Sequence, residues 1–365
     1  MGEARYARRA LRTRYLFPAL FVPILASQGC TSCAGSAQGL LGIMPGVVND
    51  PSNRALRQSI LAFGMGQFCQ QMQTHDAPLA LAPGSNIIGR FYPTQCQTQE
   101  LQNGDWFVQF SGFGYAWTNL SKKLTFTMSG AVEYMADFQM SGSTMYIYFR
   151  PRQVTSSNFA SHVIEQPVAQ FLNSLSNLGD TFGKQLVSSQ LGAGFTVIRA
   201  SNGSSDFSVG LIEVGKTPQH PIDVHGTDRI TWENARVEVH GNERDFVGPI
   251  EVTGSGRAIY LSGQLDGIPA LDVLLLRKDV GDGSLQLYYN YPQSGPLAGP
   301  PLGQAVMQQG QPFTHAFPVD AGLYYVVFDN TSSAGAVAAQ ALAPMSLLTD
   351  SAAVVSYAAQ IGDAP

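Results

Sequence analysis

The most explicit chemical pattern in the sequence is a glycine-flanked segment that ends in lysine and threonine. Residues 210–217 read Gly-Leu-Ile-Glu-Val-Gly-Lys-Thr, which matches the spacing of a phosphate-binding loop. Such a loop needs backbone amides that turn around a phosphate and then continue into a helix. Here the residues between the glycines favour a β-strand, and Pro218 follows at once. We therefore interpret residues 210–217 as the end of a strand and predict no nucleotide site.

Side chains that can bind metal ions also occur close together in one segment. They are His220, Asp223, His225, Asp228 and His240. Histidine and carboxylate ligands suit zinc, but zinc sites have characteristic ligand spacings. The spacing here matches no such motif, and Pro218 and Pro221 lie at the start of the segment. We interpret these side chains as surface residues at a junction between domains.

Two further patterns have simpler explanations than a functional site. Asp279 and Asp282 alternate with glycine and could hold calcium, although a plain hairpin turn accounts for them without a metal. There is no Gly-x-Ser-x-Gly motif, and residues 254–256 (Gly-Ser-Gly) read as a turn. We predict no metal, no cofactor and no catalytic residue. A Ser/His/Asp or two-carboxylate site built from distant residues stays open, because such sites are defined only in three dimensions.

The first thirty residues have the features of an export signal. Five arginines lie between Arg5 and Arg14, and an apolar run follows from Tyr15 to Ala26. A basic segment, a short apolar segment and a small residue at its end form the pattern of a secretory signal. The run is too short to cross a bilayer as a helix, which takes about 20 apolar residues. We therefore predict that residues 1–29 are a signal peptide.

The end of this segment resembles the cleavage site of bacterial lipoproteins, through Gly29 and Cys30. In that family the signal is removed before a cysteine that becomes acylated, so the resemblance implies lipid attachment at Cys30. Residues 27–28 (Ser-Gln) stand where the family has leucine and a small residue. An ordinary secretory signal cut nearby and an uncleaved anchor are the alternatives. Residues 31–32 (Thr-Ser) lack the aspartate that retains such proteins in the inner membrane, so the resemblance implies a stable anchor in the outer membrane.

The four cysteines fit this interpretation in one main way. If Cys30 is lipidated, Cys33 lies in a flexible tether over residues 30–50, and Cys69 and Cys96 are the natural pair in an oxidising compartment. Their bond would close a loop of roughly 28 residues and stabilise the fold by on the order of 3 kcal/mol. A bond between Cys30 and Cys33 is the competing pairing, and it would exclude lipidation at Cys30.

Composition limits the class of protein and of partner. The chain has 365 residues, of which 13% are charged and 44% hydrophobic, and this is typical of a globular protein. Removing residues 1–29 removes five of the 21 basic side chains and one of the 26 acidic ones, which leaves a net charge of −9. A nucleic-acid-binding protein needs a basic patch, so we exclude nucleic acid as a partner. The remaining length suggests two domains.

Residues 51–215 read as an α+β domain in which helices accompany a curved antiparallel sheet. Asp50 and Pro51 are typical of a helix start, and the apolar spacing predicts a helix over residues 52–73. Alternation of apolar and polar residues predicts the strands that follow. The further elements are strands at 106–117, 124–134 and 145–149, a helical segment at 158–191, and closing strands at 194–200 and 207–214.

Residues 230–362 read as an all-β sandwich after a junction at residues 216–229. Short strands recur along this stretch, turn residues separate them, and no segment has convincing helical periodicity. The predicted strands are 235–240, 247–252, 257–261, 271–277, 285–291, 312–318, 323–330, 337–343 and 353–361.

The stretch from Ala321 to Asn330 (AGLYYVVFDN) resembles the closing strand of small extracellular β-sandwiches of the GOLD and bacterial pre-peptidase C-terminal types. In those domains a Gly-x-Tyr-Tyr turn enters a core strand after an edge, which here runs from His315 to Val319. The resemblance covers residues 230–362. It implies a domain that packs against or binds accessory partners and carries no catalytic residues.

The order of elements in residues 51–215 faintly resembles the tubular lipid-binding domains of small bacterial lipoproteins, in which a curved sheet wraps a helix around an apolar tunnel. Methionine side chains adapt to varied apolar ligands, so a methionine-rich set could line such a tunnel, and the alternative is an ordinary core. The candidate lining residues are Phe126, Met128, Met135, Phe138, Met140, Met145 and Tyr148.

These observations together predict an exported, lipid-anchored, non-enzymatic envelope protein that binds a hydrophobic ligand or a protein partner. The alternatives are a structural component of an outer-membrane or surface assembly, and a hydrolase whose site is not visible in the sequence. The expected partners are the membrane, through Cys30, and a lipid or an envelope protein. A continuous apolar tunnel would favour a bound ligand, and a filled core would favour a structural role.

Overall fold

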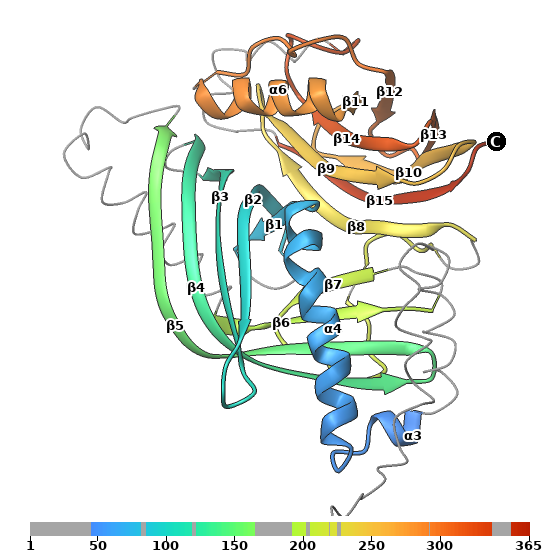
Figure 1. Cartoon of the computed structure of the whole chain (residues 1–365). Coiled ribbons are helices and arrows are strands. Elements are labelled where there is room, and N and C mark those ends of the chain that lie inside the picture. Colours follow the sequence, from blue (N-terminus) through green and yellow to red (C-terminus); the bar gives the residue numbers. More distant parts are fainter. Residues whose placement is uncertain are drawn as a thin grey trace, which may run out of the picture.

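The computed structural model describes residues 45–81, 85–118, 122–164, 192–201, 205–218, 220–224, 228–291, 293–337 and 352–365 (Figure 1). The protein is mostly β-structure, with few helices and large curved sheets. The predicted signal peptide, Cys30 and Cys33 lie outside the described residues, as does most of the predicted tether. Among the helices that the structure describes, none is long and apolar enough to cross a membrane.

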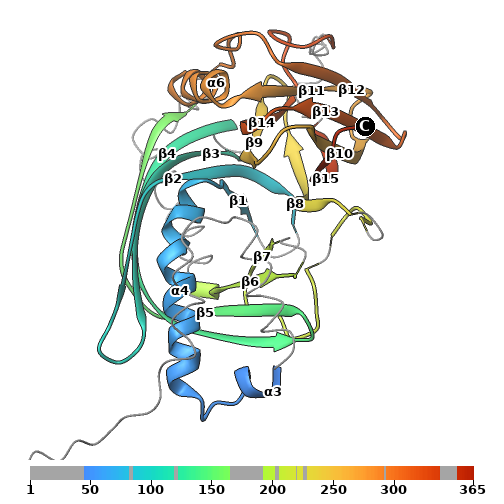
Figure 2. The same cartoon turned by 45° about the vertical axis from the view of Figure 1, so that its right-hand side comes forward.

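The N-terminal part of the molecule, residues 45–218, is a curved antiparallel sheet with one long helix on its concave side (Figures 1 and 2). The helix begins shortly after Pro51, as the sequence predicts, and its predicted end is also confirmed. The elements are α3 (Pro45–Val48), α4 (Arg54–Gln73), β1 (Ala77–Ala80), β2 (Ile87–Glu100), β3 (Trp106–Thr118), β4 (Lys122–Ser141), β5 (Thr144–Ile164), β6 (Phe195–Arg199) and β7 (Ser205–Val209).

Extra residues in β5 explain how the sheet bends around α4. The register between β4 and β5 shifts at three places, which leaves Arg152, Thr155 and His162 without a paired residue in β4. Such bulges bend a strand and increase its twist. In Figure 1 both strands turn sharply along their length, so that their two halves enclose the helix.

The C-terminal part, residues 228–365, consists of two packed layers of sheet with a helix on the outside. Apolar side chains from both layers, such as Val273, Phe328 and Tyr357, form one buried core between them. The helix α6 covers the outer face of the smaller sheet. The elements are β8 (Ile230–Val239), β9 (Arg244–Val252), β10 (Arg257–Asp266), β11 (Ala270–Arg277), α6 (Lys278–Asn290), β12 (Gly303–Gln308), β13 (Phe313–Val319), β14 (Gly322–Asp329) and β15 (Ala353–Asp363).

One sheet runs through both parts of the molecule. Its strand order is β13-β10-β15-β8-β2-β3-β4-β5-β6-β7, with β1 also paired to β2, whereas the smaller sheet has the order β12-β11-β14-β9. The connection between the parts is thin, because β2 and β8 share a single registered pair, Ile87 with Val237. We call the boundary between the two parts the seam.

Aromatic side chains from both parts close the seam beside this pair. Tyr92 and Tyr115 of the curved sheet share one apolar cluster with Phe246 of β9 and Tyr288 of α6. The rings of Tyr115 and Tyr288 meet edge to face with centroids 5.0 Å apart. This geometry is favourable for aromatic pairs beyond the area that they bury, so packing as well as sheet pairing joins the two parts.

Two predictions of secondary structure are wrong. The segment 278–290, predicted to contain a hairpin turn and then a strand at 285–291, is the helix α6. The first residues of the predicted helical segment 158–191 belong to β5, and those after Ile164 lie outside the described residues until residue 192. The predicted strand 337–343 lies almost wholly outside the described residues. The other strands predicted for both parts are present, but β4 continues to Ser141 and β5 to Ile164, well beyond their predicted ends at residues 134 and 149.

Candidate functional site

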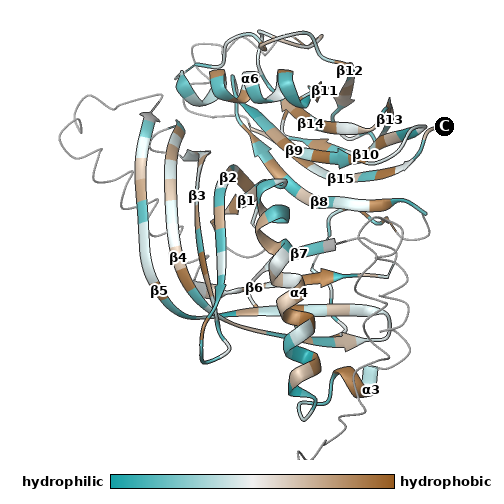
Figure 3. Ribbon diagram, viewed as in Figure 1, coloured by the Kyte–Doolittle hydropathy of each residue, from teal (hydrophilic) through white to brown (hydrophobic). Residues whose placement is uncertain are grey.

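The concave face of the curved sheet is the first candidate site, and α4 occupies it. The helix is hydrophobic in its middle and hydrophilic at both ends (Figure 3). Its C-terminal half packs Met65, Phe68 and Met72 against the apolar cluster that contains Phe126 and Met128. Two of the predicted lining residues therefore belong to the apolar cluster against which the helix packs.

The N-terminal half of α4 packs against a second apolar cluster. Leu56, Ile60 and Leu61 lie against buried Phe138 and Met140 of β4, and Met145 joins the same cluster from β5. Phe138 has no exposed surface. Both halves of α4 thus pack apolar side chains against the sheet.

The structure does not bring all of the predicted lining residues together. Phe126 and Met128 belong to one cluster, and Phe138, Met140 and Met145 to another. Tyr148 is buried in a third cluster with Tyr146 and Ile198. Met135 is half-buried, and its sulfur lies 3.7 Å from Nη2 of Arg152.

Specific contacts fix α4 to the sheet near both of its ends. At its start, Arg57 forms an ion pair of 2.5 Å with Asp137, donates to the carbonyl of Phe138 at 2.7 Å and lies over the Phe138 ring. Towards its end, Cys69 forms a disulfide with Cys96 of β2, with Cα atoms 5.2 Å apart. The predicted disulfide is therefore confirmed.

The outward side of α4 carries an exposed aromatic ring and two glycines. Phe63 is 63% exposed, the highest value among the exposed large hydrophobic side chains of the described residues. A Cβ atom built on Gly64 or Gly66 would meet no other atom within 4 Å. The helix therefore presents an apolar side chain next to open space.

Two histidines of the segment 206–240 each pair with one carboxyl group. His220 lies 2.7 Å from Asp206, and this hydrogen bond raises the pKa of His220. His240 lies 2.9 Å from Glu238 and stacks on Trp117. His225 lies outside the described residues. In the part of the chain that the structure describes, no three such side chains could hold a metal ion together.

The phosphate-loop pattern does not lead into a helix. Gly210 directly follows β7, and the amide of Lys216 donates to the carbonyl of Glu213 in a turn. The next regular element in the described residues is the strand β8. The segment lacks the helix N-terminus that a phosphate loop requires.

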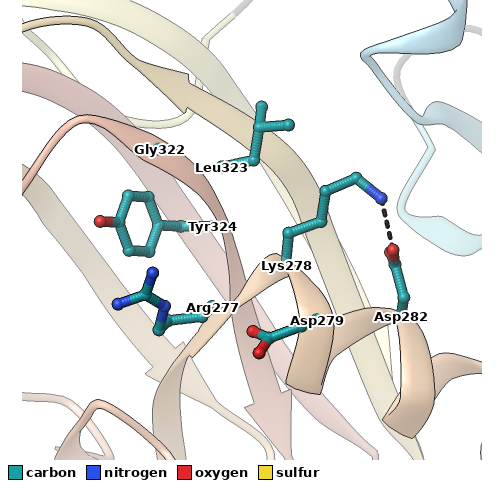
Figure 4. Close-up of a pocket in the computed structure, with 7 residues that line it drawn as sticks. All are labelled: Arg277, Lys278, Asp279, Asp282, Gly322, Leu323 and Tyr324. Atoms are coloured by element: carbon teal, nitrogen blue, oxygen red, sulfur yellow. Dashed lines mark hydrogen bonds and ion pairs between the residues drawn. The ribbon is translucent and has the colours of Figure 1, made fainter.

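Asp279 and Asp282 lie on the first turns of α6 and line an open hollow of about 420 Å³ (Figure 4). Asp282 forms an ion pair with Lys278 and accepts a hydrogen bond of 2.9 Å from the hydroxyl of Tyr325. Arg277 of β11 and Tyr324 of β14 are paired residues on neighbouring strands, and they line the opposite wall of the hollow. Cationic and anionic side chains mix in this hollow, which gives it no clear preference for one class of ligand.

The strongest concentration of buried charge lies at the seam and centres on Arg90 of β2. Its Nε donates to both carboxylate oxygens of Asp245 at 2.9 Å, and its Nη2 donates to the hydroxyl of Tyr357 at 2.8 Å. Its Nη1 forms an ion pair with Asp76 and lies 3.2 Å from Glu233. The Arg90 side chain is fully buried. We call these five residues the Arg90 cluster.

Backbone and tyrosine groups complete the hydrogen bonds of the cluster. The hydroxyl of Tyr115 donates to Asp245 at 2.8 Å and accepts from the amide of Phe246, also at 2.8 Å. The second oxygen of Asp76 accepts from the amide of Gly248 at 3.0 Å. Burial raises the pKa of Tyr115 well above its ordinary value, so its hydroxyl stays protonated and able to donate.

The cluster holds one positive charge and three carboxyl groups. Burial lowers the pKa of Arg90, but the three carboxylates outweigh this effect and hold its pKa well above the ordinary value. Burial raises the pKa of Asp76, and it raises the pKa of Glu233 to about 7 despite the nearby guanidinium. The proton of Glu233 is therefore exchanged near neutral pH.

Sequence reasoning missed this cluster, although one signal was present. Arg90 interrupts the apolar stretch from Ile87 to Tyr92, and a charge in such a stretch needs a buried partner. The partners could not be named, because Asp245 is 155 and Tyr357 is 267 positions away along the chain.

Comparison with known proteins adds no evidence on function. No family model and no curated protein matches the chain. Among solved structures, the Bombyx mori GH32 beta-fructofuranosidase BmSUC1 is similar at 9% sequence identity and a TM-score of 0.13, over 78% of this chain and 68% of that one. A likeness at this TM-score carries no argument about fold or activity.

Proposed function

We propose that this chain is an exported envelope protein that binds a protein partner through the outward side of α4. In this proposal a lipid on Cys30 anchors it in the outer membrane. The N-terminal part acts as an α+β binding domain and the C-terminal part as a β-sandwich interaction domain. No residue is assigned a catalytic role.

The observation that carries the proposal is the position of α4. The helix packs Phe68 and Leu61 against the apolar clusters of the sheet, and it leaves Phe63 exposed on its outer side. Exposing a large aromatic ring costs favourable burial, whereas aromatic side chains are enriched in protein interfaces. The disulfide at Cys69 supports export, because such bonds persist in oxidising compartments.

A hydrophobic ligand is the second candidate. The two clusters along α4 contain Met65, Met72, Met128, Met140 and Met145. Flexible methionine side chains can repack around varied apolar molecules. In this case the ligand would displace part of α4 from the sheet, since the helix now occupies that space.

Two measurements on protein purified from its native membrane test anchor and ligand together. Intact mass is expected to show a chain that begins at Cys30 and carries acyl groups. Lipid analysis of the same sample is expected to show no stoichiometric lipid besides the covalent chains. A chain without acyl mass would refute the anchor, and a stoichiometric lipid released on denaturation would replace the protein partner by the ligand.

The partner surface is tested with a photoreactive amino acid at Ser59, which is exposed one turn before Phe63. We expect cross-linking in intact cells to one protein, which is then purified and titrated. Phe63→Ser should weaken its binding at least tenfold, and Leu302→Ser, which removes a similarly exposed apolar side chain elsewhere, should not. Equal affinity of the wild type and the Phe63 variant would contradict the proposal.

A further inference from the structure

We propose that the Arg90 cluster is a proton-operated latch across the seam. It holds the two parts of the molecule together while Glu233 is protonated, and it loosens their contact when Glu233 ionises.

The cluster spans the seam through side chains from both parts. Arg90 and Asp76 come from the N-terminal part, from β2 and from the turn between α4 and β1. Glu233, Asp245 and Tyr357 come from β8, β9 and β15 of the C-terminal part. Every hydrogen bond from Arg90 to these three residues therefore crosses the seam.

Glu233 is the carboxyl group best placed to exchange a proton. Its oxygens lie 3.2 and 3.3 Å from Nη1 of Arg90, whereas Asp245 receives the bidentate contact at 2.9 Å. Its side chain is 14% exposed, against 1% for Asp76 and 3% for Asp245. Water reaches Glu233 more easily than the other two carboxyl groups.

The charge balance explains why ionisation opens the seam. With Glu233 protonated and the two aspartates ionised, the cluster carries a formal charge of −1. When Glu233 ionises the charge becomes −2, and like charges in a poorly hydrated site repel one another strongly. Separation of the two parts relieves this repulsion by giving the carboxylate access to water.

Other titratable groups surround Glu233. Asp76, Asp245, Tyr357 and Arg90 face it from the elements already named, and burial keeps the Tyr357 hydroxyl protonated by raising its pKa well above the ordinary value. The ring of His75, next to Asp76, stacks on Trp232, next to Glu233, with centroids 5.4 Å apart.

A second proton-linked contact, between His220 and Asp206, lies further along the chain. The pKa of His220 is also raised, so the stability that this pair contributes to the fold is also lost as pH rises. A test of the latch must therefore separate Glu233 from His220.

Sheet pairing resists opening only weakly at this place. Ile87 and Val237 form the single registered pair between β2 and β8, whereas β8 and β15 pair along nearly the whole of β8. A change in the Arg90 cluster therefore acts where the large sheet is most easily interrupted.

Hydrogen exchange of the β2 and β8 amides in the full-length protein tests the latch, after correction for the intrinsic pH dependence of exchange. We expect the opening constant of wild-type protein to rise about tenfold between pH 6 and 8, from a carboxyl pKa near 7 when closed and near 4.5 when open. Glu233→Gln, a neutral isostere, should remove this rise. Glu251→Gln, on the exposed face of β9, should retain it.

The same rise in wild type and Glu233→Gln, or no rise in wild type, would overturn the latch. If Glu233→Gln does not fold, the same exchange measurement on His220→Gln tests the latch. Persistence of the rise in that variant supports Glu233 as its source, and its disappearance overturns the proposal.

Discussion

All three nitrogens of the Arg90 guanidinium donate within the fold, and the side chain is among the largest that are fully buried. Apolar residues in place of the whole cluster could fill the same volume without the cost of removing charges from water. The charged arrangement instead fixes the relative orientation of β2 and β9. The planar guanidinium of Arg90 binds Asp245 in a bidentate manner and accepts few other geometries. The cluster therefore sets how the two parts meet.

Replacing Arg90 by methionine should destabilise the protein severely. The change leaves Asp76, Asp245 and Glu233 buried together without their cation, and breaking a buried pair in this way costs about 3–5 kcal/mol. Urea unfolding at pH 7 measures the loss. The loss should shrink at pH 5, because the orphaned carboxyl groups of the folded variant then take up protons.

A matched control is the exposed ion pair of Arg257 and Asp363, whose side chains are 26% and 88% exposed. Arg257→Met should change the free energy of unfolding by less than about 1 kcal/mol, as expected for a surface pair. Similar losses in both arginine variants would show that burial of the Arg90 cluster has no special cost.

The pKa of Glu233 also predicts how stability changes with pH. The folded protein keeps this proton up to about pH 7, while the unfolded chain releases it near pH 4.5. Stability contributed by the protonated carboxyl is therefore fully present below pH 4.5 and is lost as pH rises to 7, by on the order of 3 kcal/mol. The difference in unfolding free energy between wild type and Glu233→Gln, measured from pH 4.5 to 8, should follow this course.

The glycines of the two long helices, α4 and α6, differ in how closely other residues pack against them. On the outward side of α4, a Cβ at Gly66 would meet open space, whereas a Cβ at Gly281 of α6 would collide with the ring of Tyr325. The absence of a side chain at Gly281 allows α6 to approach β14 closely and lets Tyr325 donate to Asp282. Glycine is thus a packing requirement in α6 and not in α4.

Alanine at these two positions should have opposite effects. Gly66→Ala should stabilise the protein by about 0.5–1 kcal/mol, because alanine loses less backbone entropy in a helix. Gly281→Ala should destabilise it by about 1–3 kcal/mol, because the added methyl group overpacks the contact with Tyr325. Thermal unfolding of both variants checks the pair. A stabilised Gly281 variant would contradict the close approach of α6.

The disulfide that joins α4 to β2 should contribute measurably to the stability of the fold. Replacing both Cys69 and Cys96 by alanine frees the unfolded chain from a closed loop, which costs roughly 3 kcal/mol of stability. Denaturant unfolding should show this loss, and wild type under reducing conditions should show the same. Unchanged stability in both cases would mean that the packing of α4 alone holds it.

Periodicity predicted most elements where the backbone is regular and failed where it is not. The alternation of Leu124, Phe126 and Met128 identified β4 correctly. In β5 the bulges at Arg152, Thr155 and His162 each insert one residue, so the apolar spacing drifts away from two and imitates a helix near Val163. In α6, Gly281 and Gly283 looked like turn formers, and only the tertiary contact with Tyr325 explains the first of them.

The candidate sites were less predictable than the elements. Cys69 and Cys96 could be paired on the condition that Cys30 is lipidated, as its resemblance to a lipoprotein signal implies, and the apolar lining residues could be chosen by type. Their division among three clusters depends on which strands α4 covers, which the sequence does not reveal. The Arg90 cluster joins residues from both parts of the chain, so its partners emerge only when the sheet is assembled.

The whole molecule should unfold as one unit, although its two parts have separate apolar cores. The seam combines the pairing of Ile87 with Val237, the Arg90 cluster and the aromatic contacts of Tyr115. Calorimetry should show one transition with equal calorimetric and van 't Hoff enthalpies. Arg90→Met should separate it into two transitions, and two transitions in wild type would contradict the coupling.

The disulfide has a mechanical consequence for the seam. Asp76 and Arg90 both lie within the loop that Cys69 and Cys96 close. When the chain is stretched from its ends, the covalent path runs from Cys69 through the two sulfur atoms to Cys96 and bypasses residues 70–95. The backbone that carries Asp76 and Arg90 therefore cannot be extended until the disulfide is reduced.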